Sequence, residues 1–383
     1  MGIKWRLGII ALLFVFLAAN FPQRVGAEIS VNAKSAVLME QKTGRVLYEK
    51  NAHKISRIAS ITKIMTAILA IESGKMNKNV TVSENAIRAE GSSIYLKPGE
   101  KIKLSDLVYG LMLRSGNDSA VTIAEAVGGS MEGFVFLMNQ KAREIGMKDS
   151  HFSNPHGLDD HENHYSTAYD MALLTRYAMK NEVYRKISSS KNHRAPNPSE
   201  KWDRVWKNKN RLLSMYKYCT GGKTGYTKRA KRTLVSTATK GDMSLIAVTL
   251  NDPNDWNDHI SMYENGFDSF DMAEVVSKGD IEIKKNPYSK GKLYLKRSIV
   301  YPATSEEMKD FKVKYELIKV RRGALNVSKG SKIVGKAVVY FEGKRIQAAP
   351  IYYTSMKKGN ESKGILDYFK NMFLTIFGVN RNG

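Results

Sequence analysis

The apolar residues of the first 270 positions follow two periods, one typical of strands and one typical of helices. Short apolar runs at residues 36–39 and 44–48 flank the polar segment 40–43, and this pattern predicts two strands joined by a turn. Runs rich in β-branched residues at 234–238 and 245–250 predict two more strands. We expect these four runs to lie in a sheet.

Helical patterns fill much of the chain between these strands. The stretch from Ser60 to Ser73 is rich in Ile, Met, Ala and Leu and ends at Gly74, which predicts a buried helix. Residues 148–166 carry turn residues, acids and histidines and predict a loop. Further helices are predicted at residues 104–113, 120–127, 131–145, 168–179 and 256–270. Residues 28–274 therefore form an α+β domain.

The composition changes near Val275. From Lys278 to Lys363 there are 21 Lys and Arg residues against 8 Asp and Glu residues. Turn residues separate short β-type runs at residues 281–283, 293–295, 299–301, 313–317, 336–341 and 346–351. This pattern predicts a small β-rich domain at residues 275–357.

The first 27 residues have the pattern of a secretory signal peptide. Lys4 and Arg6 precede an apolar stretch at residues 7–19, and small residues at 25–27 predict cleavage before Glu28. The apolar stretch is short for a membrane span, although an uncleaved N-terminal anchor is the alternative. We therefore expect an exported protein.

The other end of the chain is amphipathic. Residues 364–378 place most of their apolar side chains, several of them aromatic, at helical spacing, and Lys363 and Lys370 are basic neighbours. The segment is too short to span a bilayer, which needs about 20 residues. It fits a helix lying on the outer face of the cell membrane. The alternative is a terminal helix packed on its own domain.

The formal net charge of the 383-residue chain is +24. In a cytoplasmic protein this charge would indicate nucleic acid, but the signal peptide argues against such a partner. Outside the cytoplasm the polyanions are anionic lipid head groups and cell-wall polymers. Cys219 is the one cysteine, so no intramolecular disulfide can form. A packed thiol is the simpler interpretation of it, because no histidine adjoins it in sequence.

Three short motifs occur in a fixed order: Ser60-Ile61-Thr62-Lys63, Ser115-Gly116-Asn117 and Lys223-Thr224-Gly225. By composition about one or two Ser-x-x-Lys would occur by chance in a chain of this length, and each of the other two motifs far less than once. All three in this order therefore form a specific signal. It indicates a serine acyl-transfer site for D-alanyl peptides or penicillin.

The chemistry of these residue types supports that interpretation. On a helix, Ser60 and Lys63 lie one turn apart, so the lysine amine can take the proton of a serine nucleophile. Lys63 acts as that base only if burial or a neighbouring cation lowers its pKa. Lys223 could be that cation and could also bind a substrate carboxylate. Ser115 can relay a proton to the leaving amine.

The remaining motif residues are expected to bind the substrate. Asn117 supplies an amide that can hold both the substrate backbone and Lys63. Thr224 adds a hydroxyl for a carboxylate, and Gly225 lets a peptide approach along a strand edge. A peptide added to that edge would be recognised by main-chain hydrogen bonds.

The segments around the motifs resemble the low-molecular-mass penicillin-binding proteins that are D-alanyl-D-alanine carboxypeptidases. The resemblance is carried by residues 57–66, 113–118, 152–158 and 221–227 and covers about residues 30–270. The overall likeness is to the sporulation-type enzymes of endospore formers, which trim spore-cortex peptidoglycan. This likeness implies the membranes around a forespore as an alternative location. The resemblance implies a β-lactamase/transpeptidase-like fold, an antiparallel sheet with helices, followed by a β-rich domain and an amphipathic C-terminal helix.

The resemblance also implies a mechanism that uses no cofactor. Ser60 attacks the carbonyl between two terminal D-alanines of a peptidoglycan stem peptide, and the oxyanion lies on the backbone N–H groups of Ser60 and Tyr226. β-Lactams acylate Ser60 by the same route. Some family members carry His after Lys-Thr-Gly, whereas this chain has Tyr226, so any role of that His side chain is lost.

Two other functions remain open in the sequence. A class A β-lactamase needs a glutamate base for deacylation, and Glu162 lies in the right stretch without that family's local pattern. A catalytically silent sensor of peptidoglycan or β-lactam is the other alternative. Residues 159–164 hold acids and histidines, but a solvated loop is a simpler interpretation than a metal site, because the helical His-Glu-x-x-His pattern is missing.

Overall fold

The computed structural model describes residues 29–198, 200–283, 286–288, 291–318 and 332–355. The expected signal peptide at 1–27 and the amphipathic helix at 364–378 both lie outside the described residues. The described residues fall into two compact units, divided between Asp271 and Met272.

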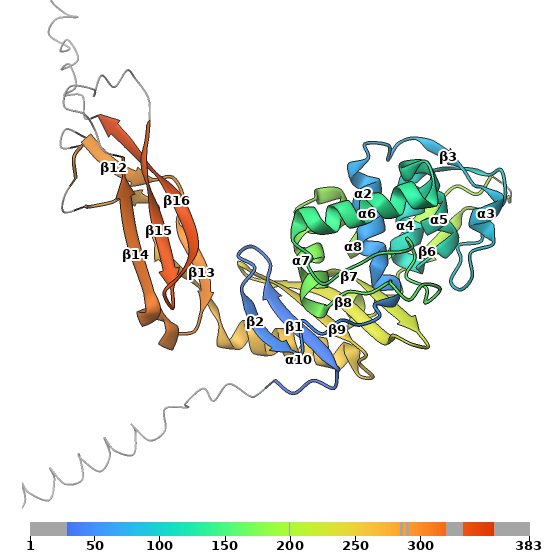
Figure 1. The fold of residues 1–383 in the computed structure, drawn as a ribbon, viewed down its shortest axis with the longest axis horizontal. Helices are drawn as coiled ribbons and strands as arrows, with labels where there is room; N and C mark the ends of the chain where they lie inside the picture. Colours follow the sequence, from blue (N-terminus) through green and yellow to red (C-terminus); the bar gives the residue numbers. More distant parts are fainter. Residues whose placement is uncertain (1–28, 199, 284–285, 289–290, 319–331, 356–383) are drawn as a thin grey trace, which may run out of the picture. The chain divides into compact units, whose positions relative to one another are not determined.

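The first unit contains a five-stranded sheet in which every neighbouring pair is antiparallel. Its order across the sheet is β2 (Val46–Lys50), β1 (Ser35–Glu40), β9 (Met243–Leu250), β8 (Lys231–Lys240) and β7 (Cys219–Thr227). The two ends of this unit's sequence therefore meet in one sheet, and β7 forms one of its edges (Figure 1).

Both faces of this sheet are covered, because successive side chains of a strand point to opposite sides. Val37 and Met39 of β1 belong to the main hydrophobic cluster with the helices. Leu38 lies on the other side, against α10 (Asp255–Ser269), where a Cβ at Gly266 would come 2.8 Å from its Cδ2. The apolar run at residues 36–39 is a strand buried on both faces.

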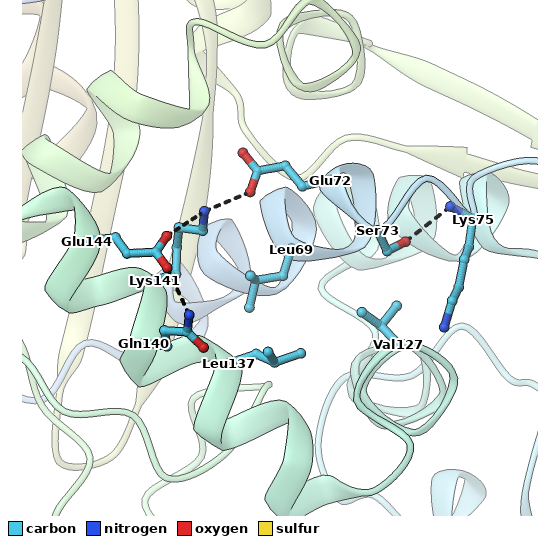
Figure 2. Close-up of a pocket in the computed structure, with 9 residues that line it drawn as sticks. All are labelled: Leu69, Glu72, Ser73, Lys75, Val127, Leu137, Gln140, Lys141 and Glu144. Atoms are coloured by element: carbon cyan, nitrogen blue, oxygen red, sulfur yellow. Dashed lines mark hydrogen bonds and ion pairs between the residues drawn. The ribbon is translucent and has the colours of Figure 1, made fainter.

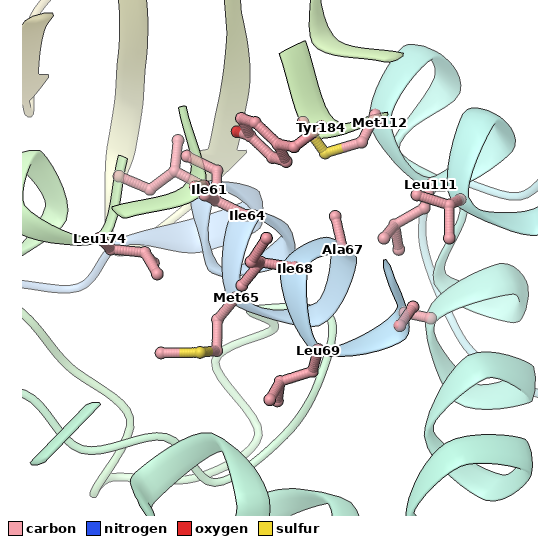
Figure 3. Packing of buried hydrophobic residues seen from close by; sticks show 14 of the residues in the cluster. Ile61, Ile64, Met65, Ala67, Ile68, Leu69, Leu111, Met112, Leu174 and Tyr184 are labelled. Carbon is pink, nitrogen blue, oxygen red and sulfur yellow. The ribbon is translucent and has the colours of Figure 1, made fainter. Parts of the chain in front are cut away.

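The helices of this unit surround α2 (Lys63–Glu72), whose apolar residues are all buried. Figure 3 shows Leu111, Met112, Leu174 and Tyr184 packed around it. These side chains come from three of the surrounding helices, which are α4 (Leu104–Arg114), α5 (Asn117–Gly128), α6 (Met131–Ile145), α7 (Ala168–Ala178) and α8 (Glu182–Ser189). An apolar residue on every side of a helix is what a central position requires.

The helices predicted for the first unit are all present, with bounds within three residues of those expected. A 3₁₀ turn, η1 (Ala59–Thr62), precedes α2, so Ser60 lies on the turn rather than in the α-helix. The sequence patterns did not predict several short elements, which are β3 (Asn79–Thr81), β4 (Lys101–Lys103), α3 (Glu84–Ile87), α8, β5 (Asn192–Ala195), β6 (Arg204–Lys207) and α9 (Leu212–Met215).

The second unit is β-rich, as expected. Its main sheet has the order β11 (Gly279–Asp280), β12 (Gly291–Leu295), β16 (Lys344–Ser355), β15 (Lys332–Phe341) and β14 (Phe311–Leu317). A second, two-stranded sheet pairs β10 (Asp271–Val276) with β13 (Ile299–Ala303), and a 3₁₀ turn, η2 (Glu306–Asp310), precedes β14.

One predicted strand of this unit is wrong. Residues 281–283 follow the short strand β11 and are not themselves in a strand. Ile281 and Ile283 pack against the core of the unit instead, and this packing accounts for their apolar side chains. The other five predicted runs lie in strands.

Among the described residues, no single helix is long and apolar enough to cross a membrane. Only α5 and α6 taken together reach that length and apolarity, and the two helices meet at a bend of 84°.

Candidate active site

The three motifs, far apart in sequence, meet in the first unit. The Lys63 Nζ lies 2.9 Å from the Ser60 Oγ and 2.7 Å from the Asn117 Oδ1. The Lys223 Nζ lies 3.1 Å from the Ser115 Oγ. One site is thus formed by residues from three places: the turn before α2, the α4–α5 junction and the edge strand β7.

The Lys63 amine is fully buried. Its third polar neighbour is the backbone carbonyl of His156, with 2.7 Å between the Nζ and the oxygen. Burial holds the pKa of Lys63 well below its ordinary value, and the positive charges of Lys223 and then Lys209 lower it further. The uncharged amine is therefore favoured in the folded protein.

The backbone around Ser60 is strained and tightly supported. Ala59, just before Ser60, has φ 51°, which is uncommon for a residue with a side chain. Its carbonyl accepts a hydrogen bond from the Thr62 Oγ1 at 2.8 Å. Gly157 packs so closely on this turn that a Cβ at residue 157 would overlap the Ala59 carbonyl oxygen. Such strain persists where the surrounding structure enforces it, often at functional sites.

The second motif lies where α4 ends and α5 begins. Ser115 ends α4 in the left-handed conformation, with φ 64°. The Asn117 backbone N donates to the Ser92 carbonyl at 2.7 Å, and its Nδ2 donates to the carbonyl of Glu90. The loop containing Glu90 and Ser92 thereby fixes the amide of Asn117, whose Oδ1 is left for Lys63.

Asp118 holds the same loop from the start of α5. Its buried carboxylate accepts hydrogen bonds from the Ser93 Oγ at 2.6 Å, the Ile94 N at 3.1 Å and the Leu96 N at 3.2 Å. The sequence analysis did not assign Asp118 a role. Its position directly after the second motif is the sequence feature that could have indicated such a role.

The third motif lies on β7. Lys223 is buried, and burial lowers its pKa to about 7, with Lys209 as the next cause. Its Nζ also donates to the Thr224 carbonyl at 2.6 Å. Gly225 lies against the Ser60 turn, because a Cβ there would come 2.9 Å from the Ser60 backbone N. Tyr226 follows on the same strand and is 64% exposed.

Residues 148–166 form a loop, as expected. Within it, the stretch 159–164 was expected to be solvated, but His164 is buried. Asn154 and His156 of the same loop are buried as well. The His164 Nε2 lies 2.8 Å from the Thr62 Oγ1, and burial lowers the pKa of both histidines to about 3. These histidines are neutral and structural, and the His156 carbonyl faces the Lys63 amine.

Glu162, the candidate β-lactamase base, and the isolated residue His259 both have structural partners. Glu162 is exposed and pairs with Arg57 and Arg229, and Arg229 is the main reason that its pKa is lowered. His259 is buried between Ser236 and Thr249. In the described part of the chain, no group of three His, Cys, Asp or Glu side chains could hold a metal ion.

Cys219 matches the expected packed thiol. The side chain is partly buried, and burial raises the pKa of its thiol to about 11. A thiol with a raised pKa is a poor nucleophile at neutral pH.

A separate groove of about 360 Å³ lies at the far end of α2 (Figure 2). Lys141 is held there by Glu72 at 3.1 Å and by Glu144 at 3.0 Å. The ten residues of α2 span about 15 Å, so this groove is remote from Ser60. None of the motif residues lines it.

Comparison with known proteins gives a consistent result for both units. A family model described as D-alanyl-D-alanine carboxypeptidase (Peptidase_S11) matches residues 22–254. A second model, described as the C-terminal domain of penicillin-binding protein 5, matches residues 270–358.

Curated relatives match over nearly the whole chain. D-alanyl-D-alanine carboxypeptidase DacF of Bacillus subtilis is 34% identical over 94% of this chain and 94% of its own length. D-alanyl-D-alanine carboxypeptidase DacC of Escherichia coli is 31% identical over 96% of this chain and 95% of its own length.

Solved structures confirm the expected fold class. Penicillin-binding protein 5 of Haemophilus influenzae superimposes with a TM-score of 0.69 at 28% identity, over 85% of this chain and 97% of that one. The carboxypeptidase DacD of Francisella tularensis gives a TM-score of 0.66 at 26% identity, over 86% and 94%. Each of the two units, the transpeptidase-like one and the β-rich one, thus matches a known protein family.

Proposed function

The chain belongs to the D-alanyl-D-alanine carboxypeptidase family, and from that membership and the geometry of its site we propose a role for each motif residue. The protein is a serine hydrolase of that family, which acts on D-Ala-D-Ala peptides of peptidoglycan and binds β-lactams. The single observation that carries the residue roles is the buried Lys63 amine, 2.9 Å from the Ser60 hydroxyl.

The hydrogen bonds that the groups around Lys63 can make determine which way the lone pair of its amine points. The Asn117 Oδ1 and the His156 carbonyl can only accept hydrogen bonds. A neutral amine has two N–H bonds and one lone pair, so these two acceptors take both hydrogens. The lone pair is then left facing the Ser60 hydroxyl, which is the orientation a general base requires.

Acylation follows from this arrangement. Lys63 takes the hydroxyl proton while the Ser60 Oγ bonds to the carbonyl carbon of the penultimate D-alanine. The negative oxygen that forms is stabilised by the backbone N–H groups of Ser60 and Tyr226. The C–N bond then breaks, and Ser115 relays the proton from Lys63 to the leaving amine of the last D-alanine, which returns Lys63 to its neutral form.

Substrate binding uses the strand that lies beside the nucleophile. The substrate peptide adds to the edge of β7, and Gly225 lets the Ser60 turn pack directly against that strand. Its terminal carboxylate is bound by the Thr224 hydroxyl and by the charge of Lys223. Water then attacks the acyl carbon and gives a proton to Lys63, and Lys63 returns that proton to the Ser60 Oγ as the acyl C–O bond breaks.

The experiment is an assay of D-alanine release from diacetyl-Lys-D-Ala-D-Ala. The wild-type protein should release D-alanine, and Ser60→Ala should release none. Ser73→Ala is the matched control, because Ser73 is a partly buried serine at the far end of α2. A wild-type protein that releases no D-alanine but turns over penicillin quickly would contradict the proposed function.

The β-lactamase alternative is not favoured. Glu162, its candidate deacylation base, is 75% exposed in its side chain and is paired with two arginines. Those arginines lower its pKa, which weakens it as a base. Nothing in the geometry favours a silent sensor, since the residues needed for acylation lie within contact of one another.

The proposal for the cellular location rests on the two chain ends and the basic second unit. We place the enzyme outside the cytoplasm, on the outer face of a membrane, with residues 364–378 as the surface anchor. Deleting residues 364–383 should move the protein from the membrane fraction to the soluble fraction, and unchanged partitioning would count against the anchor.

The proposed role in the spore cortex rests on the sequence resemblance to sporulation-type enzymes. In an endospore-forming host, loss of the enzyme should leave more pentapeptide side chains in cortex peptidoglycan. Muropeptide analysis of purified spores measures this directly. An unchanged cortex with an altered vegetative wall would contradict the role.

A further inference from the structure

Lys209 lies beside the second motif but is not part of any motif. It follows β6, and its backbone N donates to the Leu113 carbonyl at 3.0 Å, two residues before Ser115. Its Nζ donates to the Ser92 Oγ at 3.1 Å. Because the Ser92 carbonyl accepts from the Asn117 N, Lys209 is linked to both ends of the Ser-Gly-Asn motif.

The same segment is also tied to the third motif. Asn210 is buried, and its Nδ2 donates to the Gly221 carbonyl at 3.2 Å, two residues before Lys223 on β7. The position of residue 209 is therefore fixed relative to α4, to the loop around Ser92 and to β7.

Its charge acts on both catalytic lysines. After burial, the positive charge of Lys209 is among the causes that lower the pKa of Lys63 and of Lys223. Lys209 itself is exposed, and its own pKa is lowered by partial burial and then by Arg114. The charged and titratable groups around Lys63 are Lys223 of β7, Lys209, Asp118 of α5, and His156 and His164 of the loop at 148–166.

We propose that Lys209 is a positioning residue for acyl transfer: its ammonium fixes the loop that holds Asn117 and keeps Lys63 ready to accept the proton of Ser60. The inference rests on the proposed function. A third ammonium beside two buried amines makes it costlier for either of them to carry a charge. The hydrogen bond to Ser92 separately holds the loop on which the Asn117 amide depends.

The test compares Lys209→Met, Lys209→Arg and Ser92→Ala, with Lys207→Met as the control for an exposed lysine two residues away. All four variants should keep the wild-type melting temperature within a few degrees. Lys209→Met should lower kcat/KM for D-alanine release at pH 7 by about tenfold, because a misplaced catalytic group costs at least that much. Lys209→Arg and Lys207→Met should stay near wild type.

The pH profile separates charge from position. In Lys209→Met the acid limb of kcat/KM should move to higher pH, because Lys63, which must be neutral to act as the base, then holds its proton more strongly. Ser92→Ala keeps the charge, so its rate should fall while its acid limb stays in place. Added salt should move the wild-type limb upward as well, because an exposed charge is screened.

Two results would overturn the proposal. A rise in KM in Lys209→Met with an unchanged acid limb would make Lys209 a substrate-binding group instead. If kcat/KM and its acid limb in Lys209→Met were equal to those of the wild-type protein, Lys209 would have no role in acyl transfer. If the wild-type protein released no D-alanine, the same profiles would be measured as the rate of Ser60 acylation by penicillin, which tests Lys209 independently of the peptide.

Discussion

At the residue scale, the turn that carries Ser60 depends on a glycine from a distant loop. Gly157 has φ 84° and faces the Ala59 carbonyl at a distance that leaves no room for a Cβ. The residue therefore meets two separate demands, a left-handed backbone and close contact. Both bear on the position of Ser60.

Gly157→Ala should lower the free energy of unfolding by roughly 2 kcal/mol or more and should abolish most of the acylation rate, since Ala59 and Ser60 must move. Chemical denaturation and the rate of penicillin acylation measure the two effects. Gly146→Ala is the control, because Gly146 has φ 85° with open space around it. That variant should lose about 1 kcal/mol and keep its acylation rate. Equal losses of stability and of acylation rate in the two variants would contradict the close contact between Gly157 and the Ala59 carbonyl.

The sequence analysis reached only part of the site. The motif spacing identified Ser60, Lys63 and Asn117, and the structure brings their side chains together. It missed the His156 carbonyl, because a backbone acceptor has no signature of its own and lies 93 residues from Lys63. It missed Lys209 for a similar reason, since one lysine in a Lys-rich chain carries no pattern.

At the element scale, the junction of β9 and α10 contains a buried acid. Asp252 is fully buried, and burial raises the pKa of its carboxyl to about 6, with Asp258 as a further cause. Its folded pKa lies above the ordinary value of 3.8, so the protonated form is the one that suits the fold. The stability it contributes is complete below about pH 4 and is lost as the pH rises through about 6.

Asp252→Asn should remove this dependence. Relative to wild type, the variant should have a similar melting temperature at pH 4 and a higher one at pH 8, because the amide stays neutral. Asp242→Asn, in the exposed turn between β8 and β9, should show no such difference between the two pH values. A stability difference that is independent of pH would show that the carboxyl does not titrate as described.

The long elements were predictable because their apolar residues are periodic and their ends are marked. The structure shows α6 beginning at the Ser130 cap and ending at Gly146. Short elements were not predictable. The hairpin of β5 and β6 has four residues in each strand, and the Arg204 side chain is buried there by pairing with Glu100. Such strands form through tertiary contacts rather than through an apolar pattern.

At the scale of the whole molecule, the change in composition near residue 275 was the strongest guide to organisation. The chain divides after Asp271, and each unit has its own hydrophobic cluster. All of the motif residues lie in the first unit. The second unit contributes none of the described contacts around Ser60 and Lys63.

A protein of residues 28–271 should therefore fold and release D-alanine from diacetyl-Lys-D-Ala-D-Ala at a rate within about twofold of the full chain, because a unit with its own core can fold alone. Circular dichroism checks the fold and the release assay checks the rate. A folded protein with a loss of more than tenfold would mean that the second unit supports the site.

The proposed mechanism depends on activation of Ser60 by the neutral Lys63 amine. Covalent labelling by benzylpenicillin tests this activation, and intact mass and peptide mapping follow its rate and position. We expect one adduct on Ser60 in the wild-type protein, none in Ser60→Ala, and a rate lowered at least a hundredfold in Lys63→Met, since a general base contributes about 10²–10⁴ to the rate. An adduct on another residue, or a Lys63→Met protein labelled at the wild-type rate, would contradict it.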